Sequence, residues 1–597
     1  MDVKGYWKRY EDWVIPLLCI LLLFGAAGVW FDFYYDLNDD VLIKDILSGV
    51  YTGTPESRNV QMLWPLGAFL ALLYRILPGV PVLGGFLWLC QAGSIYCILR
   101  CSLRFSGSAW GKCFLNLIET AAIGSMLFYH FVFVQYTVTS GLLMAAAVIS
   151  FLTCESDEGG PGRRIRKNLP AAGLALLSFL MRSEMMLLLL PLAGVAGIWK
   201  WSEERPVFTK ENMVCYVGLF GGILLGMAAV FSADAAAYGS EEWKAFRELF
   251  DARTEIYDFK SAELRSYEKN EAFYDSLGVS GAQCALLENY NYGISERIDG
   301  ELLKEVSAYG LETQGYFFHS LQEGLWLYRE RLRDNRALGF REMPFLLTEA
   351  VLLALLLLVG LKQRKGDIFW KAGLFAAVRS VLWLYLILRE RVPERISHPL
   401  YFMEIGMLAC LLLRLMAQEE EYDRSFAWRS AGLPRFPVRP VAAALLTVIA
   451  LAGLPEELGR TARQYAARER ENRLDLAARA YYRERPDRLY LADVMSTVDF
   501  SEKLFAADDG FGNYDLLGGW LCKSPLAVKK LQAFGYDTVQ EAVADTGTFL
   551  AGREEVSWDW LVEALAEQGI YGEVVCVDTV SVEEEKWRIW QFVPREE

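Results

Sequence analysis

The segment that decides how this chain is interpreted is FDFYYDLNDDVLIKDILSGVY, residues 31–51. It follows directly on an apolar run, residues 14–30, which is long enough to cross a membrane as a helix. Carboxylates at the edge of a bilayer are easily solvated, and an Asn-Asp-Asp triplet is also a good helix cap. At the mouth of a membrane-buried protein, however, the same triplet can supply a catalytic base. The acidic residues of the segment are Asp32, Asp36, Asp39, Asp40 and Asp45.

The composition is that of a membrane protein with soluble parts attached. Of the 597 residues, 53% are hydrophobic, and several further apolar runs reach the roughly 17 to 22 residues that a span needs. The eleven cysteines are scattered without a Cys-x-x-Cys pair, so neither a disulfide framework nor a zinc site is indicated. The net charge of −15 argues against a nucleic-acid partner.

Basic residues set the expected orientation in the membrane. Three of them precede the first apolar run, so we expect the N-terminus in the cytoplasm and residues 31–59 outside. Residues 61–77 are apolar but interrupted by a Trp-Pro pair and by Arg75, which fits either a span or a helix at the outer interface. The interfacial alternative places six successive segments, each with three or four basic residues, on the inside. A span there would place all of them outside.

We therefore predict a polytopic α-helical membrane protein with about eleven transmembrane helices. The expected spans are residues 14–30, 82–99, 114–133, 138–153, 169–181, 185–199, 213–231, 344–361, 375–388, 399–416 and 441–454.

Four parts follow from this arrangement. Residues 1–231 form an N-terminal transmembrane module with the acidic first external loop. Residues 232–342 lack a membrane-length apolar run and are expected to form a helical external loop, and residues 343–455 contain the remaining spans. Residues 456–597 begin with a charged helix and then alternate short apolar strands with helices, as in a small external α/β domain.

Arginines on the outer side are the most informative charges, because they run against the positive-inside trend. One, Arg182, lies between two apolar runs beside Glu184. The others belong to RERVPERISH, residues 389–398, which contains Arg389, Arg391, Arg395 and His398. A planar guanidinium suits the oxygens of a phosphate, such as that of a lipid-linked phosphate at the outer interface. The alternative is local pairing, with Glu184 for Arg182 and with the two glutamates of the second segment.

The chain resembles the GT-C glycosyltransferases over roughly residues 10–400. The resemblance rests on a cytoplasmic N-terminus, one span, an external acidic pair, an interfacial helix with a proline, and a large external loop after the seventh span. Two segments carry it, DDVLIKDILSGVYTG at residues 39–53 and PESRNVQMLWPLGAFLALLYRILPG at residues 55–79. The pair here is Asp-Asp where many relatives have Asp-Glu, which leaves open which carboxylate acts.

The resemblance implies an inverting glycosyltransferase that takes a sugar from a polyprenyl-phosphate donor. Asp39 or Asp40 would accept the proton of the acceptor hydroxyl. Cations would stabilise the departing phosphate, and the candidates are Arg389, Arg391, Arg395, Arg182 and His398. The candidates for substrate binding are Asn38, Arg58, Tyr290 and Tyr292; the two tyrosines belong to ENYNYG, where the alternative role is packing in the core of the loop.

Partners and location follow the same resemblance. We expect a lipid-linked sugar donor, a saccharide, lipid or protein acceptor, and the cytoplasmic membrane of a bacterium, with the C-terminal domain outside. Two carboxylates can hold Mg²⁺ or Mn²⁺ but are not a complete site, so no metal ligand set is assigned. The alternatives are a flippase or transporter of lipid-linked saccharides and a non-catalytic envelope scaffold. The sugar, the acceptor and the oligomeric state are not determined by the sequence.

Overall fold

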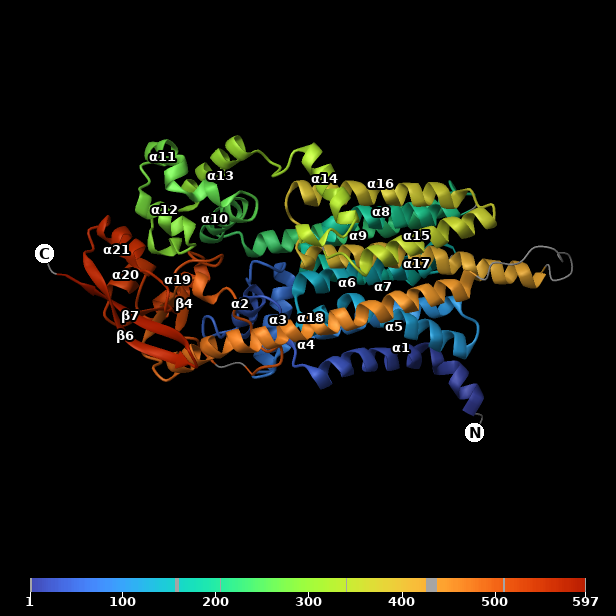
Figure 1. The fold of residues 1–597 in the computed structure, drawn as a ribbon, viewed down its shortest axis with the longest axis horizontal. Coiled ribbons are helices and arrows are strands. Elements are labelled where there is room, and N and C mark those ends of the chain that lie inside the picture. Colours follow the sequence, from blue (N-terminus) through green and yellow to red (C-terminus); the bar gives the residue numbers. More distant parts are fainter. Residues whose placement is uncertain are drawn as a thin grey trace.

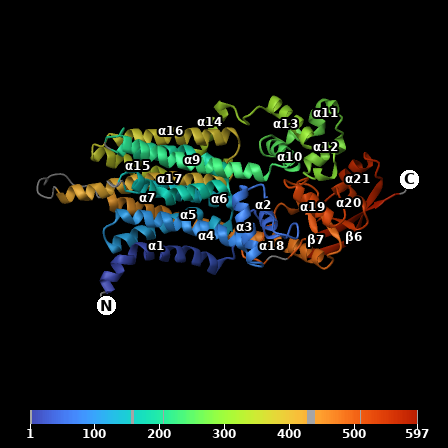
Figure 2. The ribbon, with the colours of Figure 1, turned by 180° about the vertical axis from the view of Figure 1, so that it is seen from behind.

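The computed structural model describes residues 3–155, 160–204, 206–339, 341–425, 438–507 and 510–595. The basic segment expected on the inside between the last two spans, with Arg429 and Arg435, lies outside the described residues. A long helical bundle occupies one end of the molecule and a mixed helix-and-sheet part the other (Figure 1). The N-terminal and C-terminal ends of the chain lie at these opposite ends, which is equally clear from behind (Figure 2).

The bundle confirms a multi-pass membrane protein. Ten of the described helices are long and apolar enough to cross a membrane. The expected span 169–181 forms the apolar half of an eleventh bundle helix, α7 (Pro161–Met181), whose first half is basic. The ten are α1 (Val3–Trp30), α4 (Val82–Ser102), α5 (Ala109–Val132), α6 (Tyr136–Thr153), α8 (Ser183–Glu203), α9 (Lys210–Ala237), α15 (Phe345–Lys362), α16 (Asp367–Leu388), α17 (Glu394–Ser425) and α18 (Val438–Arg483).

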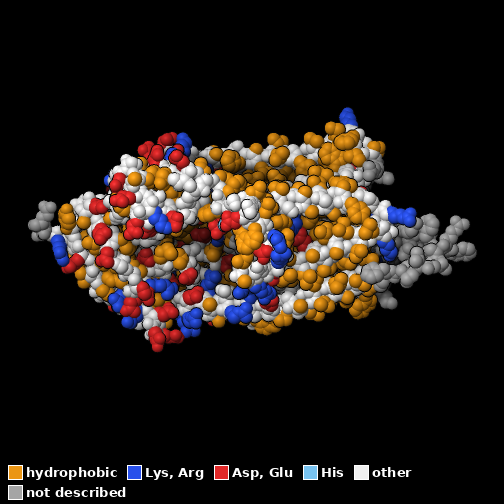
Figure 3. All heavy atoms as spheres, turned by 45° about the horizontal axis from the view of Figure 1, so that its top comes forward, with side chains coloured by type: hydrophobic (Ala, Val, Ile, Leu, Met, Phe, Trp, Pro, Cys, Tyr) orange, Lys and Arg blue, Asp and Glu red, His pale blue; other side chains and the backbone are white. Residues whose placement is uncertain are grey.

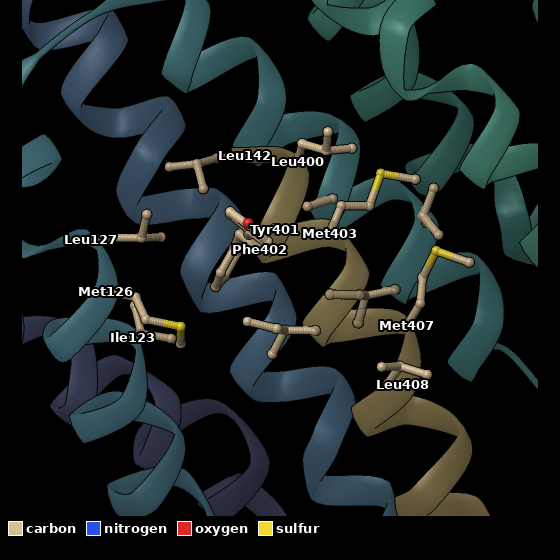
Figure 4. Packing of buried hydrophobic residues seen from close by; sticks show 14 of the residues in the cluster. Ile123, Met126, Leu127, Leu142, Leu400, Tyr401, Phe402, Met403, Met407 and Leu408 are labelled. Carbon is tan, nitrogen blue, oxygen red and sulfur yellow. The ribbon is translucent and has the colours of Figure 1, made fainter. Parts of the chain in front are cut away.

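The centre of the bundle is α6, which is buried along almost its whole length and packs against α4, α7, α8 and α17. Small residues allow this close approach, as is usual between helices in lipid. A Cβ on Gly141 would lie 2.4 Å from Cβ of Pro399, and one on Gly406 only 2.5 Å from Cδ1 of Ile149. Leu142 of α6 therefore lies among apolar side chains of α5 and α17 (Figure 4).

Charged side chains gather on the other end of the molecule, while hydrophobic ones cover the bundle (Figure 3). This end contains α10 (Glu241–Asp258), α11 (Tyr267–Ser276), α12 (Gly281–Glu288) and α13 (Gly300–Gln314), whereas the next helix, α14 (Leu321–Leu332), packs against α16 of the bundle. The charged end also contains a five-stranded sheet. Apolar residues of α10 to α13 and of the sheet share one hydrophobic core, which includes Ile256, Leu303, Leu489 and Leu550.

The sheet has the strand order β4-β3-β5-β7-β6. Strand β3 (Leu489–Ala492) pairs in parallel with the edge strand β4 (Tyr514–Leu516) and with the central strand β5 (Thr548–Arg553). The hairpin of β6 (Gly572–Val582) and β7 (Glu585–Pro594) completes it in antiparallel fashion. The helices α19 (Pro525–Ala533), α20 (Val539–Ala544) and α21 (Asp559–Ala566) connect the strands, so the expected small α/β region is confirmed.

Three helices lie where the two ends of the molecule join. Helix α18 runs without interruption from the last span into the sheet region. Helix α2 (Asn38–Ser48) and the short apolar helix α3 (Trp64–Ile76) follow α1 at the junction. As a cap, which was the alternative to a catalytic role, the Asn-Asp-Asp triplet would precede a helix that starts at Val41. The helix instead starts at Asn38, Leu37 is its N-cap, and the two aspartates occupy its first turn.

Candidate active site

A cavity of about 850 Å³ lies at the junction between the bundle and the charged end. The first turn of α2 and the starts of α6 and α8 contribute to its wall on the bundle side, together with the link between α16 and α17. The C-terminal parts of α10 and α18 and the carboxyl ends of β3 and β4 contribute to the other side. Segments that are several hundred residues apart in sequence therefore line one space.

Asp39 is the member of the acidic pair that lines this cavity. It is half-buried, and its Oδ1 accepts a hydrogen bond of 2.8 Å from Nε1 of Trp520. Trp520 follows β4 after two glycines, and the first of them needs to be glycine, because a Cβ on Gly518 would lie 1.9 Å from the carbonyl oxygen of Tyr290. This tight loop brings the indole to the carboxylate and fixes its orientation.

Asp40 points elsewhere. Its side chain is almost fully buried and accepts hydrogen bonds from the backbone N–H of Leu37 at 3.3 Å and of Tyr136 at 3.1 Å. Burial raises the pKa of this carboxyl well above its ordinary value. Asp40 is not among the described residues that line the cavity. Its hydrogen bond to Tyr136 instead connects α2 to the start of α6.

The other three acids of the first segment are paired. Asp32 is exposed and lies 2.6 Å from Nζ of Lys503. Asp36 is buried and accepts a hydrogen bond of 2.8 Å from the Tyr129 hydroxyl, as a structural residue would. Asp45 lines the cavity, and its partners are Lys44 at 2.7 Å and the hydroxyl of Tyr514 at 3.5 Å.

Three of the four expected arginines line the same cavity as Asp39. Arg182 donates to Oε1 of Gln61 at 2.6 Å and lies 3.1 Å from Glu184, so the expected ion pair is present within the cavity wall. Burial opposes the charge of Arg182, but its neighbours, among them Asp39, raise its pKa above the ordinary value. Arg182 and Asp39 are therefore electrostatic neighbours.

Arg391 and Arg395 line the cavity where α16 ends and α17 begins. Arg391 lies 3.5 Å from Asp258, the last residue of α10. Arg395 is half-buried and forms no ion pair or hydrogen bond with any residue that the structure describes. Burial lowers the pKa of Arg391, and the charges of Arg395 and Arg182 lower it further, although Asp258 acts in the opposite direction. Three like charges are thus concentrated at one wall, an arrangement that an anion would stabilise.

Two of the expected phosphate ligands do not reach the cavity lining. Arg389 is buried between the rings of Phe259 and Tyr316, 4.1 Å and 3.9 Å from its guanidinium carbon, and it donates to the Tyr316 carbonyl. His398 lies inside the bundle with its Nδ1 2.8 Å from Nε2 of His130. Both have structural partners, because two aromatic rings and the carboxylate of Glu255, 3.6 Å away, surround Arg389 and a second imidazole contacts His398.

The candidates for substrate binding divide in the same way. Asn38 and Tyr290 line the cavity, and the Tyr290 hydroxyl accepts a hydrogen bond of 2.6 Å from Arg253. Tyr292 is fully buried and donates to the carbonyl of Gly519 at 2.9 Å. Arg58 donates to the carbonyl of Ala237 at 2.8 Å, so it connects the loop between α2 and α3 to the end of α9.

The described residues do not form a metal site of their own. Of the acidic pair, only Asp39 faces the cavity. Among the described residues there is no group of three or more His, Cys, Asp or Glu side chains arranged to hold a metal ion. No chemical step is therefore assigned to a metal.

No protein-family model matches the chain, and no curated protein matches its sequence. Two solved structures are similar to it, both of ArnT from Cupriavidus metallidurans. One is in the apo state (TM-score 0.40) and one is bound to undecaprenyl phosphate (TM-score 0.37). Each alignment covers 96% of this chain and 97% of the other, at 11% identity.

Several cavity residues were not anticipated from the sequence. Asp258 and Trp520 contact Arg391 and Asp39, and Arg479 and Lys530 line the part of the cavity next to the sheet. The C-terminal domain, to which no role was assigned from its sequence, thus supplies part of the wall. A usable signal existed, since parallel α/β sheets bind ligands at the carboxyl ends of their strands, and the Gly-Gly-Trp loop stands at such an end.

Proposed function

We propose that this protein is a membrane glycosyltransferase that transfers a sugar from a polyprenyl-phosphate donor to an envelope glycan, lipid or protein. The reaction would take place on the outer face of a bacterial cytoplasmic membrane, with the N-terminus in the cytoplasm and the C-terminal domain outside. One observation carries the proposal: Asp39 and three arginines line a single cavity where the apolar bundle meets the charged end. A lipid tail can remain in the bilayer at this position while its headgroup enters the cavity.

In the proposed step, the acceptor hydroxyl attacks the anomeric carbon of the donor sugar from the face opposite the phosphate. Asp39 accepts the hydroxyl proton as the new carbon–oxygen bond forms. The bond between the anomeric carbon and the phosphate oxygen breaks, and its electron pair leaves with the polyprenyl phosphate. Attack opposite the leaving group inverts the anomeric configuration.

The arginines supply stabilisation where charge develops. Negative charge on the phosphate grows as the sugar–oxygen bond breaks, so cations aimed at it lower the barrier. Arg395, which has no described partner, is the primary phosphate ligand in this proposal. Arg391 is oriented by Asp258, and Arg182 by Gln61 and Glu184. Trp520 holds Asp39 in place through its indole N–H.

The experiment measures the release of undecaprenyl phosphate, the lipid named in one of the similar structures. The full-length protein in nanodiscs is given a panel of synthetic undecaprenyl-phosphate hexoses with a bacterial envelope extract as acceptor. The Asp39→Asn variant should lose roughly 10²- to 10⁴-fold in rate, the usual contribution of a general base. Asp32→Asn is the matched control, because Asp32 lies in the same segment but is exposed outside the cavity.

Two results would contradict the proposal. Full activity of Asp39→Asn would show that Asp39 is not the base. If the wild type released undecaprenyl phosphate from none of the donors, the proposed transferase activity itself would be contradicted.

A further inference from the structure

The part of the cavity next to the sheet has a chemistry of its own. We call Lys530, Arg479, Tyr51, Tyr514 and Asp515 the Lys530 cluster. They come from α19, α18, the loop after α2, and β4, and all five line the cavity. Figure 1 shows α19 and β4 at the side of the charged end that faces α2 and the bundle. None of these five residues belongs to the set proposed above to bind the sugar donor or to act as the base.

Lys530 is the unusual member of this cluster. Its side chain is 2% exposed, and its ammonium lies 4.2 Å from the ring centre of Tyr51 and 5.3 Å from that of Tyr514. It forms no hydrogen bond or ion pair with any residue that the structure describes. A buried ammonium without a hydrogen-bond acceptor is costly, and aromatic faces compensate only part of that cost. Burial accordingly lowers the pKa of Lys530.

The nearby carboxylates are already engaged. Asp515 accepts hydrogen bonds of 2.8 Å from the Tyr51 hydroxyl and from the backbone N–H of Leu516. Asp45 is neutralised by Lys44 at 2.7 Å. The ammonium N–H groups of Lys530, which lines the cavity, are therefore available to a ligand, whereas Asp515 and Asp45 are bound to other partners.

Arg479 adds a second cation to this wall. Its guanidinium lies 3.8 Å from the ring centre of Phe500 and 4.5 Å from that of Tyr514, and it donates to the Tyr514 hydroxyl. Tyrosine faces, hydroxyls and a carboxylate beside two cations suit a sugar ring that carries an acidic group. The position agrees with this, because β3 and β4 end here and open parallel sheets bind ligands at such ends.

We propose that the Lys530 cluster binds an acidic saccharide, with the anionic oxygens of a carboxylate or phosphate on Lys530. Given the proposed function, on which this assignment rests, the saccharide is the acceptor. Its hydroxyl then enters the same cavity as Asp39 from the side of the sheet, while the donor enters from the side of the bundle. The C-terminal domain would thus select the acceptor.

The test uses the full-length protein in nanodiscs and four probes. Digalacturonate and mannose 6-phosphate carry the two candidate anions, and digalactose and mannose are their neutral counterparts. The wild type should bind at least one acidic probe at least tenfold more tightly than its neutral counterpart, and the preferred one identifies the anion. Lys530→Met should lose that preference, and Lys530→Arg should retain most of it.

Lys529→Met is the matched control, because Lys529 is the adjacent residue but is exposed and paired with Glu56 at 2.5 Å. It should bind the acidic probe as the wild type does. Equal affinity of the wild type for acidic and neutral probes would overturn the assignment, even if Lys530→Met does not fold. Unchanged selectivity in a folded Lys530→Met protein would also overturn it.

Binding measurements with undecaprenyl phosphate distinguish a failure of this assignment from a failure of the proposed function. Its affinity should be the same in the wild type and in Lys530→Met, and saturating amounts should not displace the acidic probe. Displacement would place the acidic probe on the arginines and overturn the assignment. Failure of undecaprenyl phosphate to bind the wild type, with acidic selectivity intact, would instead contradict only the proposed function.

Discussion

Arg395 offers the sharpest test of the phosphate site, because it lines the cavity without a partner among the described residues. Replacing it by glutamine breaks no described ion pair, so the free energy of unfolding should change by no more than about 0.5 kcal/mol, as is usual for surface substitutions. The hydrogen bonds of a charged group contribute about 1.5–3 kcal/mol. Since about 1.4 kcal/mol is a factor of ten, the Kd for undecaprenyl phosphate should rise roughly 10- to 150-fold in Arg395→Gln.

The assay is a titration of the nanodisc-embedded protein with undecaprenyl phosphate, with undecaprenol as the uncharged lipid. Binding of undecaprenol should be equal in wild type and variant, because the lipid tail does not contact the guanidinium in the proposed arrangement. Arg333→Gln is the control, since Arg333 is exposed and paired with Glu330 at 3.1 Å outside the cavity. A Kd for undecaprenyl phosphate within twofold of the wild type in Arg395→Gln would refute the phosphate site.

Three further results follow from the contacts. Asp40→Ala leaves two backbone N–H groups unpaired and should lower the melting temperature, with a cost of about 1–3 kcal/mol for each, while the Kd for undecaprenyl phosphate stays unchanged; a stable variant that has lost binding would contradict the anchoring role. Arg389→Gln should likewise destabilise without weakening lipid binding, because its guanidinium packs between two rings; a large rise in Kd at full stability would return Arg389 to the phosphate site. Burial lowers the pKa of Lys530, so digalacturonate binding should weaken as the pH is raised from 7 toward 10 and the amine loses its proton, whereas Lys530→Arg should bind evenly over that range; identical pH profiles would show that Lys530 does not hold the anion.

The fold was largely predictable because its signals are local. Apolar runs of membrane length mark the spans, and alternation of short apolar strands with helices marks the α/β region. The order of elements on which the resemblance rests is confirmed, with α1, the acidic helix α2, the Trp-Pro helix α3, and a large helical unit after α9. The start of α2 was misplaced by three residues, because Asn38 looks like a cap while the backbone lets Leu37 take that position.

The site was predictable only in part, because its geometry depends on contacts between distant segments. Asp39 and Asp40 are adjacent in sequence, yet the helix turns one toward Trp520 and the other toward the backbone of α6. Arg389 and Arg391 are two residues apart, yet only Arg391 reaches the cavity. The role of Lys530 depends on its burial against Tyr51, some 480 residues earlier, and no local pattern in the sequence reports that contact.

The central claim is that Asp39 and the arginines act on one bound donor, and a structure of the protein in nanodiscs with undecaprenyl phosphate tests it most directly. We expect the lipid phosphate in the cavity, with oxygens about 2.7–2.9 Å from nitrogens of both Arg391 and Arg395, as in charge-assisted hydrogen bonds. The carboxylate of Asp39 should face the open space next to that phosphate, with room for a sugar between them. A phosphate bound outside the cavity, or one that contacts neither arginine, would contradict the account.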